Sequence, residues 1–136
     1  MILYRIRKQM SGQSAVELAI GGGVFLVVLI AFLQFGVIFY KQAWMDHVAR
    51  EAAREAAVMT SGNYNNLSDS VKDRLSGAGF DESLVNVTIN SIDDNEKIQV
   101  NITYPQPTIP IATLFQDSNS INLEANAWAY NESKVR

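Results

Sequence analysis

Residues 18–40 read LAIGGGVFLVVLIAFLQFGVIFY, a run of 23 residues in which no side chain is charged and only Gln34 is strongly polar. As an α-helix this run is about 34 Å long, whereas the hydrocarbon core of a bilayer is about 30 Å thick. A chain of 136 residues cannot easily bury a helix that is apolar on every side. A cleavable secretory signal would have a shorter apolar run and small residues at its cleavage site. The run therefore predicts a transmembrane helix.

The basic residues that precede this run set its expected orientation. Residues 1–12 contain Arg5, Arg7 and Lys8 and no acidic residue. Because positively charged flanks stay on the cytoplasmic side, we expect the N-terminus in the cytoplasm and the remaining chain outside.

The segment after the span, KQAWMDHVAREAAREAAVM at residues 41–59, is rich in strong helix formers and lacks Gly and Pro. One continuous helix is therefore expected over residues 14–59. Charged residues three or four positions apart would support it. These expected pairs are Asp46 with Arg50, His47 with Glu51, and Glu51 with Arg54.

Small residues form a stripe on one side of this second helical segment. The stripe consists of Ala49, Ala52, Ala53, Ala56 and Ala57. Because alanine side chains are short, another helix or a sheet can approach such a surface closely. The sequence therefore predicts a packing surface.

Residues 60–136 have the patterns of a small mixed domain. Leu67, Val71 and Leu75 recur every fourth residue and predict a short amphipathic helix, with Asn66 or Ser68 as its N-cap and Gly77 as its C-cap. Three stretches of alternating apolar residues then predict strands. Their apolar residues are Val85, Val87 and Ile89; Ile98, Val100, Ile102 and Tyr104; and Ile121, Leu123, Ala125, Ala127 and Ala129.

The connections between these strands carry turn and proline signals. Asp93, Asp94 and Asn95 are typical of a hairpin turn. Three prolines are expected to end the central strand and to make an extended loop, because proline lacks a backbone N–H. They are Pro105, Pro107 and Pro110. The predicted fold is α+β: a long N-terminal helix, then a short helix and an antiparallel sheet of about three strands.

Composition excludes several classes of function. The chain has 11 Lys and Arg against 14 Asp and Glu, a net charge of −3, which argues against a nucleic-acid partner. It contains no cysteine and a single histidine, His47, so thiol catalysis, a Cys-ligated zinc and a His-rich metal site are not expected. No convergent nucleophile, base and acid can be named, and we expect neither a cofactor nor a metal. An enzyme is the least favoured reading.

Two further features leave alternatives open. Gly21, Gly22 and Gly23 lie inside the apolar run, without the strand and the Lys-Ser/Thr that a phosphate-binding loop requires. In a membrane such glycines, like Gly36, permit close helix contact or local unwinding. Trp128 and Tyr130 share one face of the last predicted strand and serve either sheet packing or contact with a partner.

The most informative short motif stands where the basic segment meets the apolar run. Gly12 closes the basic segment, and Glu17 follows five residues later. With GQSAVELA at residues 12–19, QFG at 34–36, and AAREAA at 52–57, the chain resembles the TadE-like pseudopilins of tight-adherence (Tad, Flp-type) pili. The resemblance covers about residues 12–58. The three consecutive glycines depart from it, since relatives more often have bulky aliphatic residues and a proline there.

The resemblance implies a prepilin-like structural subunit, a minor pilin or pseudopilin, in the bacterial cytoplasmic membrane or, after processing, in an extracellular pilus. Residues 1–12 would be a leader, residues 13–59 a transmembrane and assembly helix, and residues 60–136 an extracytoplasmic head. A prepilin peptidase would cut between Gly12 and Gln13. The expected partners are this peptidase, other pilins, the assembly platform and membrane lipid. The alternative is an uncleaved, membrane-anchored accessory or scaffold protein.

Glu17 has a physical role in the first of these readings. A carboxylate in a helix that enters lipid is costly, by about 2.5–3.5 kcal/mol at full depth and less near the interface. Cleavage after Gly12 would create a cationic amine on Gln13, about one helical turn from Glu17. That amine, on the same or a neighbouring subunit, would neutralise the carboxylate. Otherwise Glu17 is an interfacial residue that water solvates.

Overall fold

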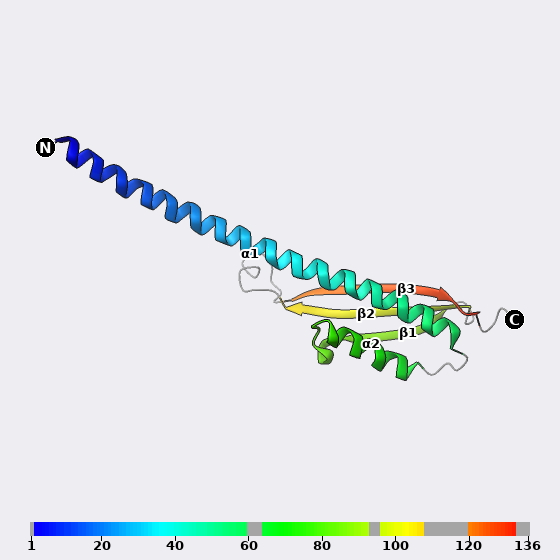
Figure 1. Cartoon of the computed structure of the whole chain (residues 1–136). Helices are drawn as coiled ribbons and strands as arrows, with labels where there is room; N and C mark the ends of the chain where they lie inside the picture. The colour runs from blue at the N-terminus through cyan, green and yellow to red at the C-terminus, as the bar shows by residue number, and fades with distance from the viewer. Residues whose placement is uncertain (1, 60–63, 93–95, 108–119, 133–136) are drawn as a thin grey trace. The chain divides into compact units, whose positions relative to one another are not determined.

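The structure, a computed structural model, describes residues 2–59, 64–92, 96–107 and 120–132, with side chains from Gly12 onward (Figure 1). The described residues form two α-helices, a 3₁₀ turn and three strands, so the predicted α+β class is confirmed. In chain order they are α1 (Ile2–Val58), α2 (Asn65–Gly77), η1 (Glu82–Leu84), β1 (Asn86–Ile92), β2 (Lys97–Pro107) and β3 (Ser120–Tyr130).

Helix α1 ends at Val58, one residue before its predicted end, but it begins at Ile2, well before residue 14. It contributes to two compact units, Met1–Val37 and Ile38–Arg136. Within the part of the chain that the structure describes, one helix, Gly12–Val58, is long and apolar enough to cross a membrane, and its most apolar window is not buried. The same helix therefore supplies an exposed apolar segment and a segment of the second unit.

The sheet of the second unit is antiparallel, with strand order β1-β2-β3. Ile89 of β1 pairs with Val100 of β2, which pairs in turn with Ala127 of β3. The alternating apolar residues within the three strands lie on one face of this sheet, as predicted, whereas Val85 precedes β1 and is buried in the core. On the central strand they are fully or almost fully buried: Ile98, Val100, Ile102 and Tyr104. The predicted hairpin turn at residues 93–95 lies outside the described residues.

The prediction that the prolines end the central strand is wrong for two of them. β2 continues through Pro105 to Pro107, and these two residues pair with Asn122 and Ser120 of β3. β1 does not reach them, because its pairing with β2 ends at Thr103. On that side β2 is an edge strand, where a missing N–H costs no ladder hydrogen bond. Pro110 lies outside the described residues.

Helix α2 buries the predicted residues Leu67, Val71 and Leu75, but it begins earlier than its predicted caps allow. Its N-cap is Tyr64, which makes no side-chain capping hydrogen bond. The Ser68 N–H donates to the Tyr64 carbonyl at 2.9 Å, so Asn66 and Ser68 are helical residues. Neither of the two predicted N-caps is correct.

The C-terminal end of α2 also differs from its prediction. Gly77 is the last helical residue, and Ala78 is the C-cap. The residue with positive φ is Gly79, at +84°, which turns the chain so that the Phe80 N–H donates to the Leu75 carbonyl at 3.2 Å. The glycine that reverses the chain therefore stands two residues later than predicted.

One hydrophobic core unites both helices with the inner face of the sheet. Figure 1 shows α2 running back alongside the last turns of α1, next to the strands. Met45 and Val48 of α1, Leu75 of α2 and Ile102 of β2 are each no more than 2% exposed. Residues Ile38–Val58 are therefore part of the fold of this unit as well as part of α1.

Candidate functional site

The alanine stripe of α1 is a packing surface, as predicted, but its partner belongs to the same chain. Ala49, Ala52, Ala53 and Ala56 are 0–1% exposed and lie in the core with the residues of α2 and of the sheet. The helix and the sheet that cover this surface are α2 and the sheet of the same unit. Close approach of the sheet and α2 to α1 depends on these short side chains.

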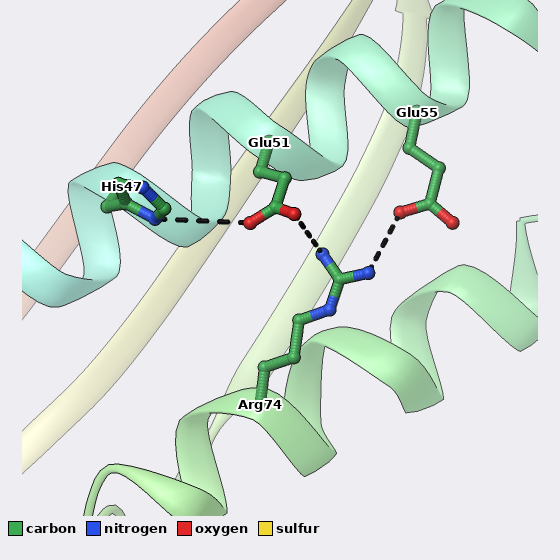
Figure 2. Close-up of polar contacts among 4 residues, drawn as sticks. All are labelled: His47, Glu51, Glu55 and Arg74. Carbon is green, nitrogen blue, oxygen red and sulfur yellow. Dashed lines mark hydrogen bonds and ion pairs between the residues drawn. The ribbon is translucent and has the colours of Figure 1, made fainter.

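Arg74 of α2 joins the two helices across their solvent side (Figure 2). Its Nη1 lies 3.3 Å from Oε1 of Glu51, and its Nη2 donates to Oε2 of Glu55 at 3.2 Å. The Arg74 side chain is 35% exposed, and those of Glu51 and Glu55 are 52% and 40% exposed. One guanidinium thus pairs with two carboxylates that stand one turn apart on α1 and reduces the repulsion between them.

Only one of the three ion pairs expected along α1 forms. His47 Nδ1 lies 3.9 Å from Oε2 of Glu51, at the limit of an ion pair. The Asp46 carboxylate instead accepts a hydrogen bond from Gln42 Nε2 at 3.3 Å. Glu51 pairs with Arg74 in place of Arg54, because α2 brings a guanidinium to the other side of Glu51.

Replacing Arg74 by methionine is expected to reduce the stability of this unit slightly. Each ion pair at this exposure contributes about 0.2–1 kcal/mol, and high salt weakens it. The Arg74→Met chain in detergent should therefore unfold at a lower urea concentration than the parent, and the difference should shrink in high salt. A salt-independent loss would show that Arg74 acts through packing of its aliphatic stem.

Lys41 makes a second connection that the sequence does not reveal. Its Nζ lies 4.9 Å and 4.8 Å from the ring centroids of Phe80 and Tyr104, and 3.4 Å from the Tyr104 hydroxyl. Next to it, Gln42 Nε2 donates to the Glu124 carbonyl of β3 at 2.8 Å. The residues just after the apolar run are thus attached to the sheet.

The residues of the predicted cleavage motif lie on an unbroken helix. α1 continues through Gly12, and Nε2 of Gln13 donates to Oε1 of Glu17 at 3.4 Å, both side chains being exposed. Arg5, Arg7 and Lys8 of the predicted leader belong to α1, and their side chains lie outside the described ones.

The glycines of the apolar run are helical as well. No atom lies within 4 Å of a Cβ built at Gly21, Gly22, Gly23 or Gly36, and the helix is continuous through all four. In this chain they therefore neither unwind the helix nor form a helix contact. Their surfaces are open to approach from another molecule.

Trp128 and Tyr130 point away from the core. They are 62% and 58% exposed, and their rings meet edge to face at 5.6 Å. On the outer face of the sheet Lys97 Nζ of β2 lies 5.6 Å from the Tyr130 ring centroid, so packing on this face and contact with a partner both remain open. Among the described side chains no three His, Asp or Glu residues gather at a metal-binding distance.

Comparison with known proteins finds one family that is similar to the long helix. The model of the TadE-like protein family matches residues 12–54, which include the cleavage motif, the apolar run and most of the alanine stripe. The resemblance read from the sequence is thereby confirmed over this segment. The match covers about a third of the chain and leaves the sheet and α2 outside it. No curated protein and no solved structure matches the chain.

The segment that is similar to this family lies entirely within Gly12–Val58, the one helix of the described residues that is long and apolar enough to cross a membrane.

Proposed function

We propose that this protein is a minor pilin or pseudopilin of a tight-adherence pilus, cleaved by a prepilin peptidase and assembled through its N-terminal helix. The observation that carries the proposal is the Gly12–Glu17 motif at the start of the apolar helix, inside the segment that matches the TadE-like family. The leader, residues 1–12, holds the precursor with its N-terminus in the cytoplasm. Residues 13–59 are the assembly helix, and residues 60–136 complete an extracytoplasmic head.

The properties of α1 support these roles for the segments of the chain. Its apolar segment is exposed, as lipid or a bundle of neighbouring helices requires, and its last turns form part of the head's core. α1 therefore contributes residues both to the apolar segment and to the head.

Cleavage between Gly12 and Gln13 is the decisive expectation. A peptidase that works at the membrane surface needs a small residue before the cut, and Gly12 is the one glycine before the apolar run. Mass spectrometry of the protein from its native host should find a chain that begins at Gln13, and Gly12→Leu should prevent this. Gly21→Ala, which changes a glycine inside the run, should leave cleavage unchanged.

The second candidate function is an uncleaved, membrane-anchored scaffold protein. The head's attachment to the helix is equally compatible with it. Recovery of only the full-length chain in a host with an active peptidase would favour this candidate and reject the proposal.

A further inference from the structure

Two pairs of like charges remain unmatched on the helices of the second unit. Arg50 and Arg54 stand four residues apart on α1, and Asp69 and Asp73 stand four residues apart on α2; all four are exposed. Within the described part of the chain, none of them forms an ion pair. Like charges at this spacing repel each other slightly, and an opposite charge from another molecule would relieve that repulsion.

The neighbouring acidic pair shows how the chain relieves such repulsion elsewhere. Glu51 and Glu55 have the same four-residue spacing, and Arg74 of α2 forms an ion pair with each of them (Figure 2). The arginine pair and the aspartate pair have no such partner within the described residues. A hollow of about 460 Å³ lies along the arginine pair, lined by His47, Arg50, Glu51 and Arg54. It leaves room for side chains from another molecule.

We propose that these two pairs join copies of this protein head to tail, with Arg50 and Arg54 of one copy binding Asp69 and Asp73 of the next. The opposite charges and the equal spacing identify a second copy as the partner. This inference rests on the proposed function in one respect: membrane-anchored copies stand with their α1 helices parallel.

The direction of the helices sets which residues meet. Because α2 runs back along α1 (Figure 1), α2 of a parallel neighbour is antiparallel to the α1 that it contacts. Arg50 then faces Asp73, and Arg54 faces Asp69. Both contacts form together, with the residue numbers running in opposite directions along the two antiparallel helices.

The contact also sets an axial displacement between copies. Arg74 binds between Glu51 and Glu55, so Asp73 lies at about the height of Arg54 in its own chain. To face Arg50 of a neighbour, it must move by four residues, about 6 Å along the helix. A displaced, head-to-tail contact does not close on itself and therefore builds a filament, whereas a symmetric dimer has no such displacement.

Chemical cross-linking in membranes tests the contact directly, because the chain contains no natural cysteine. One tagged chain carries Arg54→Cys, and a second chain with a different tag carries Asp69→Cys. A short bismaleimide is the suitable reagent, because Arg and Asp side chains separate the helices by more than a disulfide spans. We expect a mixed dimer of the two chains. The matched control pairs Arg54→Cys with Asn90→Cys, an exposed residue on the opposite face of the sheet, and should give none.

Charge reversal then tests the chemistry of the contact. Arg50→Glu with Arg54→Glu should lower co-purification of two differently tagged full-length copies about fivefold or more. Adding Asp69→Arg and Asp73→Arg to the same chain should restore it, which misfolding would not permit. Glu82→Arg, an exposed reversal outside both pairs, should have no effect.

Equal cross-linking in the control pair, or no rescue by the combined reversal, would overturn the proposal. Both measurements apply to cleaved and uncleaved chains. A chain that is cut at Gln13 but fails both tests would leave the pilin assignment intact, whereas an uncut chain that passes both would retain the contact without that assignment.

Discussion

Ala52→Leu is expected to destabilise the compact unit of residues 38–136 by about 1–3 kcal/mol, because the larger side chain must enter a core that is already packed. Ala52 is fully buried, and it lies in one core with α2 and the sheet. A leucine there preserves helix propensity but forces α1 away from its neighbours. Urea unfolding of the full chain in detergent, followed by tryptophan fluorescence, should show a lower midpoint.

The matched control for this substitution is Ala43→Leu. Ala43 belongs to the same helix and the same compact unit, but it is exposed. Its replacement should leave the midpoint within about 0.5 kcal/mol of the parent, as for most surface substitutions. If both variants unfold like the parent, the alanine stripe does not hold α1 to the sheet, and its burial has no energetic consequence.

Glu17→Val is expected to abolish incorporation into the assembled pilus while leaving insertion and cleavage largely intact. In the precursor, Glu17 is exposed and water at the headgroups can solvate it, so valine should insert at least as well. After cleavage, the Gln13 amine and the Glu17 carboxylate both enter apolar surroundings, where pairing offsets part of the cost of burying each charge. Without Glu17 the amine remains unpaired.

Sheared pili and membrane fractions from the same cells provide the measurement for Glu17→Val. The variant should be present in membranes as a chain that begins at Gln13, and absent from the pili. Val16→Ala, which alters the neighbouring residue without removing charge, should assemble normally. Incorporation of Glu17→Val at parental levels would make Glu17 an interfacial residue and would weaken the pilin assignment.

Local patterns in the sequence were sufficient for the elements of this fold. Few structures other than a long helix are compatible with an uncharged run of 23 residues. That helix ends within one residue of its predicted end. The alternation from Ile98 to Tyr104 identified the buried face of β2, since side chains of a strand point alternately to opposite sides. The motif from Gly12 to Glu17 was also readable, because its residues are close in sequence.

The helix caps show where local patterns were insufficient. Asn66 was a reasonable N-cap by residue type, yet α2 begins at Asn65, and its N-cap Tyr64 packs against the core that buries Leu67, Val71 and Leu75. Packing contributes more to a short helix than one capping hydrogen bond does.

What the tertiary structure alone decided is which residues face one another. Pro105 is tolerated in the central strand because the pairing of β1 with β2 ends at Thr103. The residues near Pro105 in the sequence carry no information about where β1 begins or ends. The alanine stripe predicted close packing, but only the folded chain shows that its own sheet and α2 occupy that surface. Arg74 likewise meets Glu51 and Glu55 from 19 or more residues away in the chain. Sequence periodicity determines which face of an element is apolar, whereas the partner of that face depends on contacts between residues distant in sequence.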